Sequence, residues 1–445
     1  MSGVEIGALS ILAMLFLVLS GMHVVAVLIV VSFGSLWIMR GDAGLAGRLL
    51  GQAAANGIEN YVFGVIPLFV LMGIFVSVSG IGRDTFDVAN AVFRRVLGGL
   101  GVATVFANAV FAALTGVSIA SAAIFTRVAV PEMLRFGYTA RFSVGVVAGS
   151  SVLGMLIPPS LLFILYAILS GESIGDMFLA GVLPGLLLTG TYAAAIVLAA
   201  RYAPGWVFAG GVSAGAAAAS LLPAEPAPGG GGSLLAKAAP IVVLIALVLG
   251  GIYGGVFTPT EAGAAGALAA FVLAGLKRSL TPGKLWRIFV ETGHVTASIC
   301  IIIMAAAMYS RMLTLSGLPA WISGGIVDAG LGLHGTLALY LLVLLVLGCI
   351  LDSASIMLIT LPLFLPIFEG FGVDLVWFGV ITVVTVEIGL LTPPLGLICY
   401  VLKSTLDDQK VTLQEIFRGA LPFAGLMAAV LVVLVAVPWF SRALL

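Results

Sequence analysis

The sequence predicts an all-α membrane protein that crosses the bilayer many times, and three observations support this. Hydrophobic residues make up 62% of the 445 residues and charged residues only 9%, whereas about a quarter of the residues in a soluble chain are charged. Continuous apolar segments of the roughly 20 residues that span a bilayer as a helix recur along the chain. They lie at 60–80, 174–200, 237–256, 295–313 and 417–440. The third observation is an internal repeat with Gly and Pro breaks inside apolar sequence.

Charge and cysteine usage exclude several other classes of function. The formal net charge is zero, and Lys and Arg are thinly spread, which argues against nucleic-acid binding. The three cysteines and three histidines are scattered, so we expect no disulfide, no cofactor and no metal beyond Na⁺. No Ser-His or Asp-Asp arrangement suggests an intramembrane protease, so we expect no enzyme. A channel would need a continuous polar path, whereas the polar residues cluster at four breaks.

Part of the chain occurs twice, and the second copy follows 235 residues after the first. The only two Pro-Pro pairs begin at Pro158 and Pro393. Each copy starts with a polar interruption, Thr115–Ser118 in the first and Asp352–Ser355 in the second, and the Pro-Pro pair forms another break. Corresponding breaks in two halves of a membrane chain indicate the binding site of a transporter.

The repeat predicts two halves joined by a linker and accompanied by further helices. We expect N-terminal scaffold helices over 1–59, a first inverted repeat over 60–203, an Ala/Gly/Pro-rich linker over 204–236, scaffold helices with a basic cytoplasmic loop over 237–292, and a second inverted repeat over 293–445. Each repeat is expected to contain a re-entrant hairpin, because its arms are too short for a full crossing, followed by a broken helix. The hairpins are predicted at about 99–132 and 335–369, and the broken helices at 138–170 and 374–402.

The loop charges predict that the two hairpins enter the membrane from opposite sides. Basic residues flank the first hairpin, among them Arg95 and Arg135, and place its ends in the cytoplasm by the positive-inside rule. A basic loop expected at 277–287, which includes Lys284, is placed there by the same rule. The exit of the second hairpin, 369–374, has no Lys or Arg. We expect amphipathic stretches at 84–97 and 318–333.

The polar interruptions and the Pro-Pro breaks contain backbone groups that could bind ions. An opened helix exposes backbone groups that each cost several kcal/mol when unpaired in lipid. Half-helix N-termini suit anions, and unwound carbonyls with hydroxyls suit Na⁺. We therefore expect two pseudo-symmetric cation sites beside one substrate site near the midplane. The predicted Na⁺-site residues are Ser118, Gly154, Pro158, Asp352, Ser353, Gly389 and Pro393, and the predicted substrate-binding residues are Thr115, Ser150, Ser151, Ser355 and Thr392.

Three acidic residues lie in apolar sequence, where a charge costs at least about 2.5–3.5 kcal/mol on insertion scales. Asp352, at a hairpin tip, is the preferred ligand of a coupling ion. Glu387 precedes a helix break and has three interpretations, as a ligand, a proton carrier or a structural hydrogen-bond acceptor, of which we favour the last slightly. Glu261 follows Thr258 at the spacing of a capping acid. For Arg127, inside the first hairpin, snorkelling to the interface is favoured over attraction of a carboxylate.

Four segments together resemble the large membrane subunit of a tripartite ATP-independent periplasmic (TRAP) transporter. They are Ile66–Gly73, Gly154–Ser160, Gly255–Gly263 and Glu387–Gly396. The resemblance implies an elevator transporter in the bacterial inner membrane, with a mobile core of hairpins and broken helices. It also implies a small four-helix membrane subunit, a soluble periplasmic binding protein, and Na⁺-driven uptake of an organic acid.

Two departures from the family pattern bear on the site. The first tip of the family usually reads Ser-Gly-Ser-Ser, where this chain has Thr115–Ser118 and one hydroxyl fewer. The family often has Asn shortly before the second Pro-Pro pair, where this chain has Thr385. The departures leave the substrate and the number of Na⁺ ions open. The alternative function is a stand-alone ion-coupled organic-anion carrier of related architecture that needs no binding protein.

Overall fold

A computed structural model of the protein describes residues 1–58, 61–209, 234–328, 330–406 and 411–445. Within these residues every named element is a helix, and the single β-bridge joins Tyr138 to Phe208. Seven of the described helices are long and apolar enough to cross a membrane, or up to eight if one bent pair counts as a span. The prediction of an all-α, multi-pass membrane protein is confirmed.

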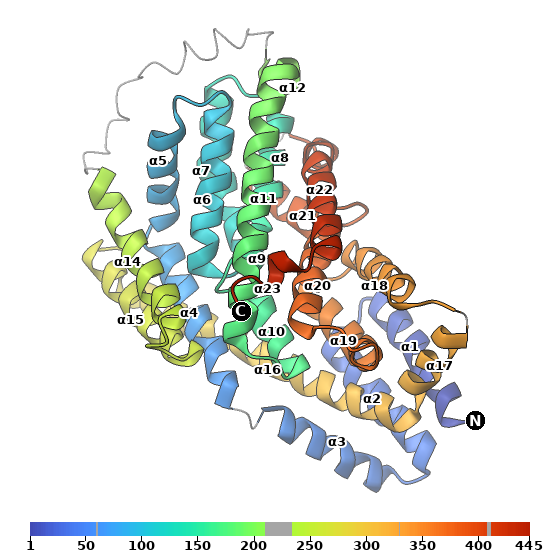
Figure 1. The fold of residues 1–445 in the computed structure, drawn as a ribbon. Helices are drawn as coiled ribbons and strands as arrows, with labels where there is room; N and C mark the ends of the chain where they lie inside the picture. Colours follow the sequence, from blue (N-terminus) through green and yellow to red (C-terminus); the bar gives the residue numbers. More distant parts are fainter. Residues whose placement is uncertain (59–60, 210–233, 329, 407–410) are drawn as a thin grey trace.

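The N-terminal helices pack along one long helix. α16 (Pro282–Ser316) has 35 residues and begins at a proline behind the capping side chain of Thr281. It contacts α1, α2 and α3 in the lower right of Figure 1; these span Gly3–Leu19, Val24–Arg40 and Ala43–Ile58. The predicted basic loop is shorter than expected, because Lys284 already lies in the first turn of α16.

Three helices of the first repeat, α6, α7 and α11, stand side by side in the upper part of Figure 1. It begins with η1 and α4, and α4 bends by 66° into α5. The break between α6 and α7 falls at the predicted first tip. The elements are η1 (Tyr61–Gly64), α4 (Val65–Val78), α5 (Ile81–Phe93), α6 (Gly99–Thr115), α7 (Ser118–Arg135), α8 (Ala140–Ser151), α9 (Leu153–Leu156), α10 (Leu161–Ser170), α11 (Ile174–Tyr202) and α12 (Pro204–Val207).

Residues 210–233 of the predicted linker lie outside the described residues. The described ends of the 204–236 segment are helical, since α12 occupies Pro204–Val207 and α14 already begins at Leu234. α14 (Leu234–Tyr253) packs against α15 (Pro259–Leu276). The predicted capping role of Glu261 is confirmed, because Thr258 and Glu261 form a complete capping box at the start of α15.

The second repeat repeats the order of a hairpin followed by a broken helix. The break between α18 and α19 falls at the predicted second tip, and α20 ends at the predicted second helix break. The elements are α17 (Leu318–Asp328), α18 (Leu333–Gly348), α19 (Ser353–Gly370), α20 (Leu375–Gly389), α21 (Leu397–Thr405), α22 (Leu413–Ala436) and α23 (Trp439–Arg442).

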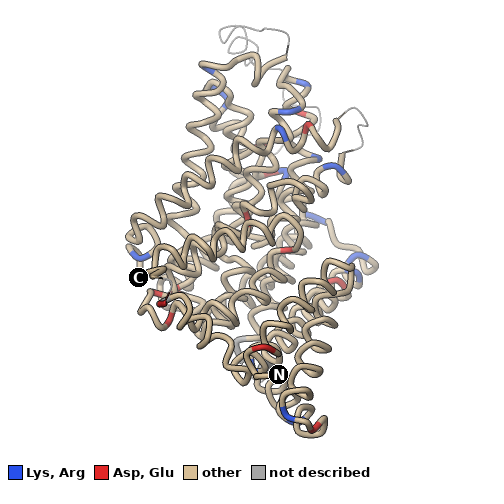
Figure 2. The backbone as a smooth tube through the Cα atoms, turned by 90° about the vertical axis from the view of Figure 1, so that its right-hand side faces the viewer, with Lys and Arg blue, Asp and Glu red and all other residues tan. Residues whose placement is uncertain are grey.

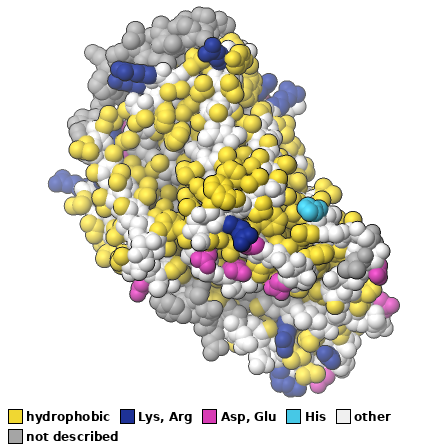
Figure 3. All heavy atoms as spheres, viewed as in Figure 1, with side chains coloured by type: hydrophobic (Ala, Val, Ile, Leu, Met, Phe, Trp, Pro, Cys, Tyr) yellow, Lys and Arg dark blue, Asp and Glu magenta, His cyan; other side chains and the backbone are white. Residues whose placement is uncertain are grey.

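The core joins the two repeats directly. α8 of the first repeat packs closely on α22 of the second, and a Cβ on Gly145 would lie only 2.3 Å from the carbonyl oxygen of Gly419. Large apolar side chains such as Phe16, Trp37 and Trp321 are exposed, and Figure 3 shows hydrophobic side chains over much of one face. Figure 2 shows charged residues thinly spread, with long uncharged stretches of the tube between them. Both features suit a surface solvated by lipid.

Candidate functional site

The first tip is a tight turn between two helices that point toward the centre of the protein. Gly116 ends α6 in the left-handed conformation, with φ of 66°, which glycine adopts without a steric penalty. A Cβ at this position would lie 2.5 Å from the carbonyl oxygen of Pro159. The first tip therefore packs so closely on the Pro-Pro break of its own repeat that only glycine fits at residue 116.

The second tip is organised by a carboxylate. Asp352 is the N-cap of α19, and its carboxylate accepts hydrogen bonds from the backbone N–H of Ser355 at 3.1 Å and from the Ser355 hydroxyl at 2.5 Å. Such a cap satisfies backbone donors that a helix start leaves unpaired. Asp352 is itself exposed, so its oxygen atoms also face the space outside the helix.

Each tip is bonded to the helix break of its own repeat. The backbone N–H of Leu161, after the first Pro-Pro pair, donates to the carbonyl of Gly116 at 3.3 Å. The N–H of Leu395, after the second pair, donates to the carbonyl of Cys349 at 3.2 Å. Both Pro-Pro bonds, which begin at the predicted site residues Pro158 and Pro393, are cis. The repeats thus share one local design.

Two glycines separated by the repeat offset allow this close packing. A Cβ on Gly154 would lie 2.9 Å from the Cα atom of Ser118. A Cβ on Gly389 would lie 2.5 Å from the Cα atom of Gly348. Separations under 3.0 Å between such atoms are not tolerated, so both predicted site glycines are required by the approach of a tip to a broken helix.

Glu387 joins the two tips. Its side chain is fully buried at the end of α20. The hydroxyl of Ser118 donates to Oε2 at 2.8 Å, and the hydroxyl of Ser353 donates to Oε1 at 3.1 Å. The sequence identified Glu387 as an acid in an apolar segment next to a helix break, but it did not predict that its side chain lies between the two tips. The observed hydrogen bonds agree with the favoured interpretation of Glu387 as an acceptor.

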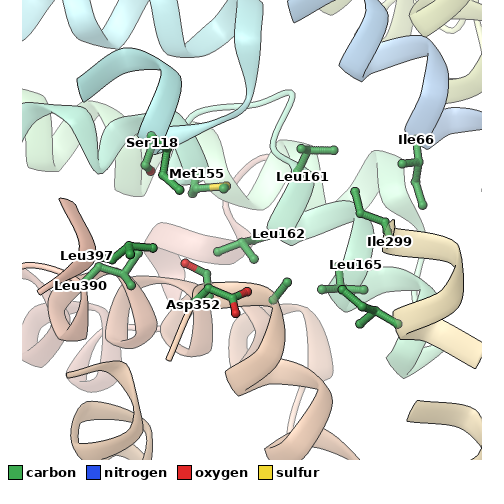
Figure 4. A pocket seen from close by; sticks show the side chains of 14 residues that line it. Ile66, Ser118, Met155, Leu161, Leu162, Leu165, Ile299, Asp352, Leu390 and Leu397 are labelled. Atoms are coloured by element: carbon green, nitrogen blue, oxygen red, sulfur yellow. The ribbon is translucent and has the colours of Figure 1, made fainter. Parts of the chain in front are cut away.

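A cavity of about 120 Å³ lies between the tips. Ser118, Asp352 and Ser353 contribute its polar side chains. Figure 4 shows Ser118 and Asp352 at one part of the cavity, with Leu165 and Ile299 further along it. Most of the other lining residues are apolar and come from α4, α10 and α16 as well as the tips; they are Ile66, Ile119, Met155, Leu161, Leu162, Ile302, Ala354, Leu390 and Leu397. Among the described residues that line it, none is Lys, Arg or His.

The five predicted substrate-binding residues lie near the tips and breaks but do not line this cavity. Their hydroxyl protons are directed to nearby acceptors: Thr115 donates to the carbonyl of Phe111, Ser150 to that of Val146, Ser151 to that of Ala148, Thr392 to that of Gly389, and Ser355 to Asp352. Ser150 also accepts a hydrogen bond from the buried Asn108 at 2.6 Å. The sequence did not predict the apolar lining, because side chains from four or more separate helices form it.

Helix N-termini and oxygen atoms lie at the cavity, and each group can be compared with the ions expected from the sequence. Ser118 and Ser353 are the first residues of α7 and α19, and helix N-termini attract anions. The carboxylate of Asp352, the serine hydroxyls and the carbonyls of the breaks form a set of oxygen atoms, which suits a hard cation such as Na⁺. The residues present therefore fit the ions that the sequence predicted.

The chain is similar to known transporter subunits over most of its length. Residues 11–440 match the family described as "Tripartite ATP-independent periplasmic transporter, DctM component". The chain is 35% identical over 389 residues to the C4-dicarboxylate TRAP transporter large permease protein DctM of Pseudomonas aeruginosa, covering 87% of this chain and 86% of that protein. It is 29% identical to the sialic acid TRAP transporter large permease protein SiaM of Vibrio cholerae, covering 97% and 96%.

Two solved structures share the fold at low sequence identity. The YdaH transporter of Alcanivorax borkumensis superposes with a TM-score of 0.59 and 15% identity over 90% of both chains. The antimetabolite efflux pump MtrF of Neisseria gonorrhoeae superposes with a TM-score of 0.61 and 11% identity over 90% of this chain and 85% of that one. The sequence matches over nearly the whole chain show that the protein belongs to the tripartite ATP-independent periplasmic transporter family, as the DctM component, its large permease subunit.

Proposed function

We propose that this permease subunit imports a small organic acid together with Na⁺. The observation that supports this most directly is the cavity between the two tips, whose polar side chains are Ser118, Asp352 and Ser353. A carboxylate bound there meets no basic side chain among the described lining residues. Its charge would be balanced by the N-termini of α7 and α19 and by cations bound beside it.

The two Na⁺ sites would lie where each tip meets its own break. In the first repeat the oxygen atoms come from Ser118 and from the backbone between Gly154 and Pro158. In the second they come from Asp352, Ser353 and the backbone between Gly389 and Pro393. The sites are unequal, because the first tip has Val117 at the position of Asp352. Bound Na⁺ would order both tips before the substrate binds.

Movement of the loaded site would follow an elevator mechanism in the bacterial inner membrane. The hairpins α6–α7 and α18–α19, read as re-entrant, and the broken helices would move as one core. The close contacts at Gly154 and Gly389 favour this, because each hairpin is packed on a break with no space for a methyl group. α5 and α17 would connect this core to a scaffold formed by the remaining helices.

The substrate would be a small carboxylated metabolite delivered by a periplasmic binding protein. Relatives of this chain are named for C4-dicarboxylates and sialic acid, and a volume of about 120 Å³ favours the smaller acids. A small four-helix membrane subunit would complete the assembly. The isethionate TRAP transporter permease protein DctMQ of Oleidesulfovibrio alaskensis is a longer chain than this one. The match covers 87% of this chain but only 58% of that protein.

Reconstituted uptake tests this proposal. The chain is placed in liposomes with its neighbouring small subunit and binding protein, and radiolabelled organic acids are supplied with a Na⁺ or a K⁺ gradient. We expect uptake that requires Na⁺ and all three proteins. Uptake by this chain alone would instead support the stand-alone carrier, and uptake that is equal in K⁺ would reject Na⁺ coupling.

A further inference from the structure

Glu387 has a position that the transport proposal leaves unexplained, because one carboxylate contacts both tips. We propose that Glu387 is a positioning residue that couples the two tips, so that cation binding at one tip favours cation binding at the other. This inference rests on the Na⁺ coupling proposed above. It adds a role for a residue that lies behind the cavity rather than in its lining.

The hydrogen bonds fix the orientation of two predicted cation ligands. A serine hydroxyl has one proton and two acceptor lone pairs. Ser118 and Ser353 each direct that proton to a different oxygen of Glu387, at 2.8 and 3.1 Å. Their lone pairs are therefore turned away from the carboxylate, toward the side from which a cation can be bound. Without Glu387 each hydroxyl could rotate, and its lone pairs would not be held for a cation.

The carboxylate also transmits order from one tip to the other. Its two oxygens belong to one rigid planar group, so fixing the bond to Ser118 restricts where the other oxygen lies relative to Ser353. The backbone limits the alternatives, because Gly389, two residues on, is packed against Gly348 of the second hairpin. A cation that orders one tip thereby meets part of the entropy cost of ordering the other, which produces positive cooperativity.

The fold itself gives no other reason for a carboxylate at this place. A buried charge is costly, and apolar residues of similar volume are often as stable or more stable. Glu387 is fully buried and takes part in none of the ion pairs of the described residues. Its neighbours along α20 are apolar or have hydroxyls bonded locally, as Thr385 is to the carbonyl of Ile381. The two serine hydroxyls are its hydrogen-bond donors.

A double-mutant cycle on Na⁺ binding tests this coupling. The full chain is reconstituted in lipid nanodiscs, and its melting temperature is titrated with NaCl at constant ionic strength, with KCl as the replacement. Ser118→Ala, Ser353→Ala and the double variant are measured, first with Glu387 present and then together with Glu387→Gln. Glutamine has an acceptor oxygen at only one of the two positions, and at the other its NH₂ group donates, so the hydroxyl there must turn its proton elsewhere and give up a lone pair. Thr382→Val, which removes a buried hydroxyl on the same helix that is bonded to Tyr340, is the matched control.

With Glu387 present we expect a Hill coefficient for Na⁺ above 1 and approaching about 2, the limit for two sites. The two serine substitutions should then be non-additive, by on the order of tenfold in apparent Na⁺ affinity. With Glu387→Gln the Hill coefficient should fall to about 1 and the serine effects should become additive. Thr382→Val should leave both quantities as in the unmodified protein.

Unchanged cooperativity in Glu387→Gln would overturn the inference while leaving Na⁺ coupling intact. A protein that Na⁺ does not stabilise relative to K⁺ would instead overturn the transport proposal itself. If Glu387→Gln does not fold, Glu387→Asp replaces it, because aspartate keeps the charge but is too short to reach both tips. Cooperativity retained in Glu387→Asp would contradict the bridging role, and its loss would support it.

Discussion

Ser118 and Glu387 are 269 positions apart in the sequence, yet the hydroxyl of one donates to the carboxylate of the other at 2.8 Å in the buried centre of the protein. This contact joins the tip of the first repeat to the broken helix of the second. The matching contact from Ser353 lies within the second repeat. The two repeats therefore meet at one shared polar group.

Asp352→Asn should weaken Na⁺ dependence while keeping the fold. Asparagine caps a helix as well as aspartate does, so the bond from the N–H of Ser355 is retained. The negative charge beside the predicted cation is lost, and we expect the Na⁺ concentration for half-maximal uptake to rise by on the order of tenfold.

Asp374→Asn is the matched control, since Asp374 caps α20 in the same manner but does not line the cavity. It should leave the Na⁺ dependence of uptake unchanged. An equal effect of both substitutions would show that Asp352 acts only through its cap. If Asp352→Ala and Ser118→Ala both preserved Na⁺-dependent transport, the assignment of the cation sites would be wrong.

Gly389→Ala should destabilise the junction between the second tip and its break. The added methyl group would lie 2.5 Å from the Cα atom of Gly348, and forcing atoms into a packed core costs about 1–3 kcal/mol. We expect a lower melting temperature and a loss of uptake. Gly190→Ala on α11, where nothing lies within 4 Å of the added atom, should be neutral or slightly stabilising. Equal tolerance of both substitutions would contradict the close packing.

The sequence predicts the local features of this fold well. The polar interruptions coincide with the ends of α6 and α18 and the starts of α7 and α19, because an opened helix in an apolar segment needs small or hydroxyl-bearing residues. The spacing from Thr258 to Glu261 likewise identifies a helix start without any tertiary information. These features depend on residues a few positions apart.

The sequence does not predict contacts that arise from tertiary packing. Nothing in the neighbourhood of Glu387 shows that Ser118 would be its partner, because the contact depends on how two hairpins are packed together. Ile299 was not expected at the cavity for the same reason, since α16 reaches it from outside both hairpins. The predicted basic loop was too long because a capped proline at residue 282 starts α16 early.

Ile299→Trp should block transport without abolishing Na⁺ binding. Ile299 lines the cavity from α16, and a tryptophan there would occupy much of its volume of about 120 Å³. The oxygen atoms of the two tips are untouched, so Na⁺ should still raise the melting temperature. Ile301→Trp, two residues away on an exposed face of the same helix, is the control and should transport normally. If Ile299→Trp abolished both uptake and stabilisation by Na⁺, the substitution would not act by filling the cavity alone, and the prediction would be wrong.

Cross-linking α5 to α14 should arrest transport if α5 is a moving arm. Two ion pairs join α5 to its neighbouring helices. Lys237 of α14 contacts Asp87 at 2.6 Å, and Lys277, the residue that follows α15, contacts Asp84. Both partners on α5 are aspartates one turn apart, so they lie on one face of that helix. The pairs hold the arm against the scaffold in this conformation, and an elevator movement would have to break them.

The test introduces Asp87→Cys and Lys237→Cys into a background in which the three native cysteines are replaced by serine. A short, cleavable, thiol-reactive cross-linker should stop uptake, and reduction of the linker should restore it. Each single variant treated with the same reagent controls for modification alone. Full uptake by the cross-linked protein would exclude α5 as a moving arm, because transport would then proceed while α5 is fixed to the scaffold. Recovery after cleavage would show that the loss came from restricted motion rather than from damage to the fold.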